Sequence, residues 1–231
     1  MSSVVATANI LCALRPAAAG EALRVVLDSG PDLVCLQEWS WRRRRLLRGT
    51  GYHWVAPLLG GCPVGARAGR YDLVESSTRL LAGPGRSDRG ARPLPVAPAR
   101  LATVAVVRDR DTGDLVSVVS FHLTPGVQRR GVYRADRPHL VGRHRRETAT
   151  LERLVAEQQR LGRTVHAGGD SNLHGFRLAG LTSAWDGDAG KGLGGSLGRR
   201  RIDDVHGPGP ALDVRLLDTP SDHRAVVVRR A

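Results

Sequence analysis

Residues 32–38, Asp-Leu-Val-Cys-Leu-Gln-Glu, form a short apolar run that ends abruptly in two polar side chains. An uninterrupted apolar run of this length is typical of a strand that is covered on both faces. We therefore predict a buried strand over residues 32–36, with Gln37 and Glu38 at its exit.

Acid, amide and imidazole side chains stand beside other apolar runs in the same way. These are Asn9 after the run 3–8, His122 after 115–121, Asp170 and Asn172 after 164–167, Asp203 in 202–205, and Asp222 and His223 before 225–228. Strand ends meet at one edge of a sheet, so we expect these side chains to form one site. Taken singly, each also has a structural explanation, such as a turn for Asn9, a solvated charge for Glu38 or a core position for His122.

Two helices and several further strands are predicted around this set. Apolar residues at helical spacing predict helices over 18–28 and 143–160. Turn residues at 111–114, between the Val-rich runs 101–107 and 115–122, predict a hairpin. Further short strands are predicted over residues 3–10, 71–76, 164–167, 202–205, 212–217 and 225–228. The Gly- and Pro-rich segments 60–100 and 186–200 are predicted to be irregular loops.

Many short strands with few helices favour two sheets packed face to face with helices outside. A simple alternation of strand and helix is absent from the pattern, which argues against a plain Rossmann architecture. The chain has 231 residues, so we expect a single domain over 1–231.

The composition is that of a globular protein, with 41% hydrophobic and 25% charged residues. No apolar run reaches the length of a membrane span, and no basic segment precedes the first apolar stretch as in a signal peptide, so we expect a cytoplasmic protein. The three cysteines, Cys12, Cys35 and Cys62, are not arranged as C-x-x-C, so we expect neither disulfides nor a thiolate zinc site.

The net charge of +13 predicts an anionic partner such as nucleic acid or a phosphate-bearing ligand. Lys191 is the only lysine, however, and arginine-rich usage also arises from GC-rich coding sequence, so both origins of the charge stay open. Arg42, Arg43 and Arg201, which lie in arginine runs, are candidates to contact phosphates, although such runs also fit a solvated surface.

The residue types at the strand exits suit metal-assisted chemistry. Hard oxygen ligands, preferred by Mg²⁺ and Mn²⁺ over zinc, are Asn9, Glu38, Asp170, Asn172 and Asp222. His122 and His223 can contact a phosphoryl oxygen or exchange protons near neutral pH, and Asp203 can fix the tautomer of one imidazole.

In their order along the chain, these motifs resemble those of the endonuclease/exonuclease/phosphatase superfamily, the deoxyribonuclease-like and exonuclease III-like phosphodiesterases. The matching segments are Thr7-Ala8-Asn9, residues 32–38, Phe121-His122-Leu123, Gly169-Asp170-Ser171-Asn172, Arg201-Ile202-Asp203 and Ser221-Asp222-His223. Two positions depart from the family pattern, because Phe121 replaces the usual Thr and Ser171 replaces the usual aromatic residue.

The resemblance implies a four-layer α/β sandwich with one site at the sheet edge. It also implies that Glu38 binds Mg²⁺, with Mn²⁺ as a substitute, that Asn9 lies close to the metal and the scissile phosphate, and that Asp222 is a second carboxylate beside the metal.

By the same resemblance, Asp170 orients or deprotonates the attacking water and Asn172 positions water or phosphate. His223, oriented by Asp203, serves as acid/base or phosphate contact, and His122 stabilises the oxyanion. Which residue acts as the base is left open.

Some family features lack a clear match. Residues 71–77 are the nearest candidate for the family's Gly-(apolar)-Ile-Leu-Ser strand, and Glu75 is a candidate partner for His122. Tyr133 is a poor match for the tyrosine of the repair-nuclease branch, which argues against an abasic-site nuclease. His174 is a candidate near the site, whereas His166 is expected to be structural.

These inferences favour a divalent-metal-dependent phosphoesterase, expected to be a monomer, that hydrolyses a phosphodiester in a substrate such as DNA or RNA. Two alternatives stay open: action on small-molecule or lipid phosphates, and a catalytically silent, basic nucleic-acid-binding protein.

Overall fold

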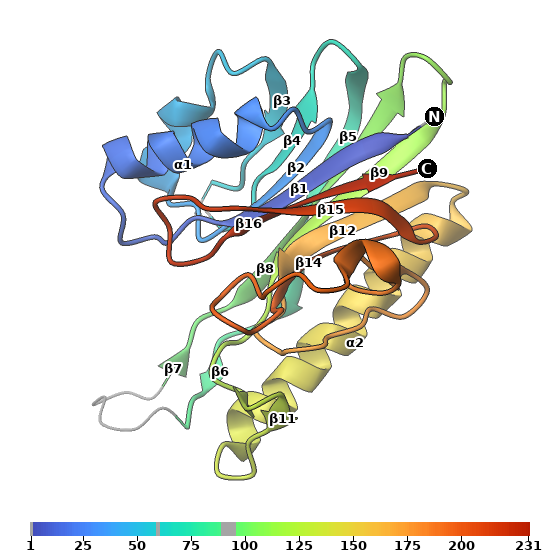
Figure 1. Cartoon of the computed structure of the whole chain (residues 1–231). Helices are drawn as coiled ribbons and strands as arrows, with labels where there is room; N and C mark the ends of the chain where they lie inside the picture. Colours follow the sequence, from blue (N-terminus) through green and yellow to red (C-terminus); the bar gives the residue numbers. More distant parts are fainter. Residues whose placement is uncertain (1, 59–60, 89–95) are drawn as a thin grey trace.

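A computed structural model describes residues 2–58, 61–88 and 96–231, and its core consists of two six-stranded sheets packed face to face (Figure 1). The first sheet has the order β15 (Ala211–Leu217), β16 (Ala225–Arg230), β1 (Ser3–Asn9), β2 (Leu33–Gln37), β4 (Val64–Arg67), β3 (Tyr52–Val55). The second has the order β13 (Thr182–Ser183), β14 (Asp203–Gly207), β12 (Thr164–Asp170), β9 (Leu115–His122), β8 (Arg100–Asp109), β5 (Tyr71–Ala82).

Smaller elements extend from the sheets. Two-stranded ribbons pair β6 (Gly85–Arg86) with β7 (Val96–Ala97) and β10 (Gln128–Arg129) with β11 (Val132–Tyr133). The helices are α1 (Pro16–Asp28), α2 (Pro138–Arg160) and the 3₁₀ helices η1 (Trp41–Leu47) and η2 (Asp188–Gly190).

The directions of the strands bring the predicted polar strand ends to one end of the sandwich. β1 and β2 are parallel to each other, as are β9 and β12, whereas β16 is antiparallel to β1 and β14 is antiparallel to β12. The carboxyl ends of β1, β2, β9 and β12 therefore meet the amino ends of β14 and β16.

Period-two alternation decides which side chains enter the layer between the sheets. Val5, Leu33 and Val118 belong to the apolar core of this layer. Further along the same strands, Asn9 and His122 follow on the same faces, four residues from Val5 and Val118. The site side chains are thus inward-facing positions of core strands, at the end where the apolar residues stop.

Each sheet buries its outer face under one helix. α1 packs through Ala19, Leu23 and Val26 against the first sheet, and α2 packs through Leu151 and Val155 against the second. Both helices begin at a proline, which is favoured at the first helical position because its missing N–H has no partner there. The four layers confirm the predicted α/β sandwich.

The hairpin of β8 and β9 confirms the prediction for residues 101–122. The strand predicted over 71–76 is confirmed as the first half of β5, which continues to Ala82. The prediction of irregular structure for the rest of 60–100 is wrong for β4 and for the second half of β5, although residues 60 and 89–95 lie outside the described residues. β5 is an edge strand whose side chains are mostly exposed, so it lacks the alternating pattern of a half-buried strand.

Two boundaries also differ from prediction. β12 does not end before Gly168 and Gly169 but continues through them to Asp170, and α2 begins at Pro138 rather than Arg143. The loop predicted over 186–200 holds only η2 and a bridge between Leu197 and Arg200. The described helices include none that is long and apolar enough to cross a membrane, and all three cysteines are free.

Candidate active site

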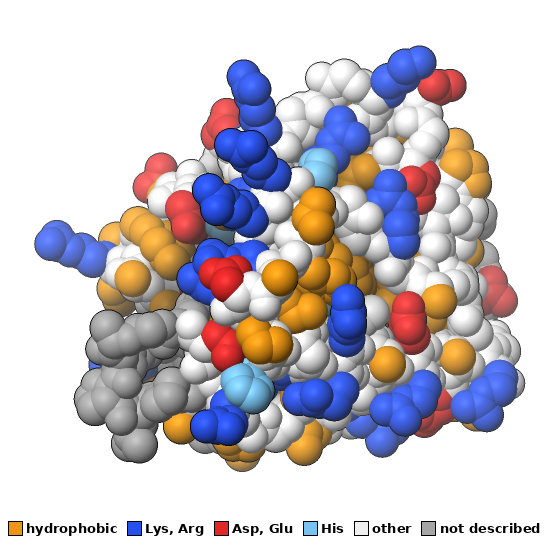
Figure 2. Space-filling model, turned by 90° about the horizontal axis from the view of Figure 1, so that it is seen from below, with side chains coloured by type: hydrophobic (Ala, Val, Ile, Leu, Met, Phe, Trp, Pro, Cys, Tyr) orange, Lys and Arg blue, Asp and Glu red, His pale blue; other side chains and the backbone are white. Residues whose placement is uncertain are grey.

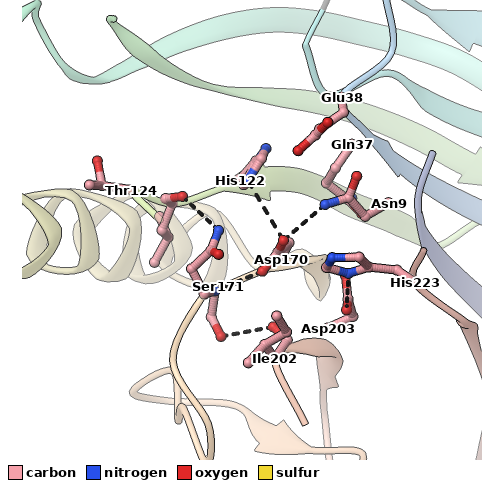
Figure 3. A network of polar contacts seen from close by, with 12 residues as sticks. Asn9, Gln37, Glu38, His122, Thr124, Asp170, Ser171, Ile202, Asp203 and His223 are labelled. Atoms are coloured by element: carbon pink, nitrogen blue, oxygen red, sulfur yellow. Dashed lines mark hydrogen bonds and ion pairs between the residues drawn. The ribbon is translucent and has the colours of Figure 1, made fainter. Parts of the chain in front are cut away.

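Asp170, at the end of β12, is the centre of a buried polar cluster (Figure 3). Its Oδ2 accepts a hydrogen bond of 2.9 Å from Asn9 Nδ2 and lies 3.6 Å from His122 Nε2. Asn9 is on the first sheet and His122 on the second, so the cluster joins the two sheets. The structure thus brings together three strand-exit residues that are separated by 161 positions at most.

The loop after Asp170 holds the carboxylate in place. The backbone N–H of Asn172 donates to Asp170 Oδ1 at 2.7 Å, and the Asn172 side chain donates to the carbonyl of Leu123 at 3.1 Å. Asn172 has a φ of 55°, which asparagine tolerates better than most residues. Ser171 donates to the carbonyl of Ile202, which ties the loop to β14.

His223 and Asp203 form a second buried unit beside Asp170. His223 Nδ1 lies 2.7 Å from Asp203 Oδ2, and Asp203 stands directly opposite Asp170 in the ladder of β12 and β14. One potential ligand atom from each of Asp170, Asp203 and His223 lies within 4.8 Å of the others.

Glu38 follows β2 with a φ of 55°, which turns its side chain out of the strand direction. Its Oε2 accepts a hydrogen bond from the backbone N–H of Cys12 at 3.1 Å. Its carboxylate points to the same side as the side chains of His122 and Asn9 (Figure 3).

Asp222 is more peripheral, because its side chain is exposed and contacts the hydroxyl of Ser221 at 3.3 Å. Ser221 in turn donates to the carbonyl of Asn9 at 2.7 Å and accepts from the backbone N–H of Leu11. The Ser-Asp-His segment is therefore fastened to the end of β1.

The two sheets approach each other closely beneath the cluster. A Cβ on Gly168 would lie 2.9 Å from Cys35 Cβ and 3.3 Å from Thr7 Cβ, so a larger residue would push the sheets apart. Gln37 spans the same gap, since it accepts from Thr7 Oγ1 and donates to Ser120 Oγ. This contact explains why β12 carries a glycine at position 168, whereas at Gly169 a Cβ would meet the carbonyl oxygen of Phe121 on β9.

Burial and crowding shift the pKa values of the cluster in different directions. Burial and the Asp203 carboxylate raise the pKa of Asp170 to about 8. Burial alone would lower the pKa of His223, but its hydrogen bond to Asp203 and the surrounding carboxylates raise that pKa to about 9. The pKa of His122 is lowered well below its usual value by burial, Arg100 and His223.

The donor set fits a hard divalent cation. Asn9 Oδ1 and Asp203 Oδ1 are buried without a hydrogen-bond partner among the described residues, and buried polar atoms rarely stay unpaired. Glu38 and Asp170 add carboxylates on the same side of the site. A cation bound among these oxygens would also offset the crowding of negative charge.

The predicted phosphate-binding arginines divide into two kinds. Arg42 is exposed and lies against the ring of Trp41, so it is free to reach a ligand. Arg43 is 4% exposed, and its guanidinium donates to the carbonyls of residues 10, 11, 12 and 14. The prediction that Arg43 binds substrate is therefore wrong, because its guanidinium holds the loop after β1 in place.

The prediction that Arg201 binds substrate is wrong for the same reason. Its guanidinium donates to the carbonyls of Gly190 and Leu193 and lies 4.8 Å from the ring centroid of Trp185. These contacts organise the loop before β14.

The predictions for three further residues, Glu75, His174 and His166, have different outcomes. Glu75 does not pair with His122, since both of its carboxylate oxygens accept from Arg163, which directly precedes β12. His174 lies next to the site loop and accepts from the backbone N–H of Arg201 at 3.0 Å. His166 is buried between the sheets, away from the cluster.

Sequence reasoning missed Arg100 and the network that supports Thr124. Arg100 begins β8 next to the end of β9, and its charge contributes to the lowered pKa of His122. Thr124 donates from both its backbone N–H and its hydroxyl to Glu147, which is paired with Arg143 at 2.7 Å. The predicted hairpin register was the one signal that could have placed Arg100 here.

No family model matches the chain, and no curated protein matches it either. Among solved structures, an endonuclease/exonuclease/phosphatase family protein from Bacteroides thetaiotaomicron is 16% identical, with a TM-score of 0.69 and coverage of 99% of this chain and 97% of the other. The D. rerio TDP2, complexed with single-strand DNA product, is 16% identical, with a TM-score of 0.66 and coverage of 100% and 99%. The mannosyl-6-phosphatase Bt3783 of Bacteroides thetaiotaomicron is 16% identical, with a TM-score of 0.68 and coverage of 98% of both chains. The chain therefore has the fold of the endonuclease/exonuclease/phosphatase proteins, as the order of its strand-exit motifs predicted.

Proposed function

We propose that the chain is a divalent-metal-dependent phosphoesterase that hydrolyses a phosphodiester by in-line attack of water. The observation that carries this proposal is the buried cluster of Asn9, Asp170, Asp203 and His223, whose oxygens include two without partners. A stable core has no need of crowded carboxylates, whereas phosphoryl transfer uses positioned charge of this kind.

Glu38 and Asn9 would hold the cation, with Asp222 near the opening of the site. When bound, Mg²⁺ supplies positive charge that stabilises the phosphoryl oxygens during transfer. Both proposed ligands stand at the ends of neighbouring parallel strands, which fix their spacing.

The remaining residues act on water and on the leaving group. Asp170, fixed by Asn9 and Asn172, orients the attacking water and accepts its proton. His223 has Nδ1 engaged by Asp203, so Nε2 is the atom that gives or takes a proton at the leaving oxygen. His122 contacts the phosphoryl oxygens from the second sheet.

A nucleic-acid substrate is supported by an arginine rim next to the site. This rim consists of Arg129, Arg130, Arg199 and Arg200, all of them exposed. His174 joins its two halves, since it accepts from the backbone of residue 201 and lies against Gly131. The rim is tied to the site through a hydrogen bond from Gln128 Nε2 to the carbonyl of Asn172. Phosphates on either side of a scissile bond would meet these arginines.

A small-molecule or lipid phosphate is the second candidate. The mannosyl-6-phosphatase shows that this fold also occurs in a phosphatase. Exposed Trp41 and Val132, on elements next to the site, would suit a substrate with an apolar part. The arginine rim favours the nucleic acid, because a single phosphate would use only one of its halves.

The test is hydrolysis of bis(4-nitrophenyl) phosphate and of plasmid DNA, each with Mg²⁺ and with EDTA. We expect turnover that EDTA abolishes and added Mg²⁺ restores. Glu38→Ala and His223→Ala should each lower kcat/KM by about 10²-fold or more, as when one preorganised charge contact is removed. Asp72→Ala, an exposed carboxylate on β5, is the control. Turnover that survives either site substitution would refute the assignment, and a folded wild-type protein without turnover would leave the catalytically silent alternative.

A further inference from the structure

A groove with a volume of about 1170 Å³ lies away from the cluster around Asp170. One wall is the exposed face of α2, and the other is the end of β5 with residues 83–86. None of the predicted site residues lines it. It opens on the outer side of the second sheet, and α2 lies on the underside that faces the viewer in Figure 2.

The sequence of α2 builds this wall through a seven-residue repeat. His139, Arg146 and Arg153 are seven residues apart, so they lie on one face of the helix at a spacing of about 10.5 Å. Gly142, Ala149 and Ala156 follow the same spacing, and these small residues leave room beside the basic side chains.

The groove carries more positive than negative charge. Arg86, Arg146 and Arg153 are exposed, and within the described parts of the chain none of them is paired with a carboxylate. Glu152, the acidic residue of the lining, is half-buried and accepts from the backbone N–H of Ala179 at 3.4 Å. Figure 2 shows Lys and Arg side chains spread over this face, with hydrophobic side chains between them.

Two arginines next to these three are instead committed to structural contacts. Arg143, deeper in the same groove, is 2% exposed and donates to Glu147 and to the carbonyls of Ala97 and Pro98. Arg79, on β5, is paired with Glu157. The arginines of the exposed α2 wall therefore keep their charge available.

We propose that this groove binds the phosphodiester backbone of a single-stranded nucleic acid, at a site distinct from the hydrolytic cluster. Arg146 and Arg153 are spaced about 10.5 Å along the helix axis, so they suit two phosphates of one strand better than a single phosphate. Recognition would be independent of sequence, because the lining offers arginines but no Trp, Tyr or Phe on which bases could stack.

A membrane surface fits this groove less well. Docking to a bilayer uses large apolar side chains that project from the surface, beside basic ones. The large apolar residue of the lining is Leu81, which is 4% exposed and belongs to the core beneath α2. A concave wall of arginines with small residues between them suits a chain that lies in the groove.

The test measures the binding of a fluorescein-labelled 20-nucleotide oligothymidine to the full chain by anisotropy, in EDTA and at several salt concentrations. The variant is Arg146→Ala/Arg153→Ala. The matched control is Arg24→Ala/Arg229→Ala, which removes the same charge from exposed positions elsewhere. Thermal melting confirms that both variants are folded.

We expect the groove variant to weaken binding about tenfold at low salt. Because each neutralised phosphate of a single strand contributes about −0.7 to the slope of log K against log salt, that slope should become less steep by about 1.4. The control should change both quantities much less. Equal effects of the two variants would overturn the proposal, since binding would then follow net charge alone. Binding to phosphatidylserine vesicles that requires Arg146 and Arg153, with oligothymidine binding unchanged, would also overturn it.

Discussion

The layer between the two sheets holds buried polar residues at both of its ends, and the two groups are built differently. At one end, Asp170 and Asp203 stand opposite each other, and two buried oxygens lack partners. At the other end, Arg230 is fully buried and donates to the carbonyls of Thr182, Val205 and Gly209.

Both ends use the same inward-facing positions of the strands. His166 and Asp170 lie on one face of β12, four residues apart, and only the second belongs to the candidate site. Around Arg230 a cation meets main-chain oxygens, which is favourable, although Arg230 Nε and His166 Nδ1 are also without a partner among the described residues. Around Asp170 like charges are crowded, which costs stability and is typical of functional sites. Buried charge alone therefore does not mark a site, whereas uncompensated buried charge does.

The largest effect that would test this comparison is expected from Asp170→Asn. It should lower kcat/KM by about 10²- to 10³-fold, because the acceptor for the proton of water is lost. The pKa of Asp170 is raised in the folded state, so its ionisation destabilises the fold as pH rises from its ordinary value through about 8. The melting temperature of the variant at pH 8.5 in EDTA should therefore exceed that of the wild type. A loss of both activity and stability would mean that Asp170 is a structural carboxylate.

Arg230→Met should show the opposite pattern. It leaves the carbonyls of Thr182, Val205 and Gly209 without their donor, so the free energy of unfolding should fall by about 3 kcal/mol. Urea titration measures this loss. The kcat on bis(4-nitrophenyl) phosphate, measured well below the melting temperature, should stay within twofold of the wild type. A large fall in kcat would show that the two ends are coupled.

The stability of the end that contains Arg230 should depend on pH through His166, which lies beside Arg230. Burial and the charge of Arg230 lower the pKa of His166 to about 4. A histidine with a depressed folded-state pKa contributes stability above its unfolded pKa, and that stability is lost as pH falls from about 6.5 toward 4. The wild type should therefore lose about 2 kcal/mol more than His166→Gln between pH 6.5 and pH 4.5. Parallel unfolding curves of the two proteins across this range would contradict the neutral, buried state of His166.

The residues of the site end were the easier ones to predict from sequence. Asn9, His122 and Asp170 follow apolar runs, and the fold converts that local pattern into proximity because strand ends converge. Arg43 could not be assigned in this way, because its four carbonyl partners belong to a loop that only the folded chain brings near.

The edge strand β5 was difficult to predict from sequence for a related reason. The sequence predicted only residues 71–76 of β5, because its second half has few buried positions, and the pairing with β8 is what extends the strand to Ala82. Glu75 is exposed on this edge strand, and its partner Arg163 precedes β12, so only the folded sheet could identify the pair.

The smallest effect is expected from Glu75→Gln, which tests a carboxylate outside both polar groups. Its side chain is 58% exposed and pairs with Arg163 at 3.0 Å, and exposed ion pairs contribute about 0.5 kcal/mol or less. Urea titration should therefore barely separate the variant from the wild type, and kcat should change by less than twofold. His122→Ala, measured alongside, should lower kcat strongly because His122 lies 3.6 Å from Asp170. If Glu75→Gln instead lowered kcat as much as His122→Ala, the edge of the second sheet would take part in catalysis, and the division between a crowded site end and a structural remainder would have to be redrawn.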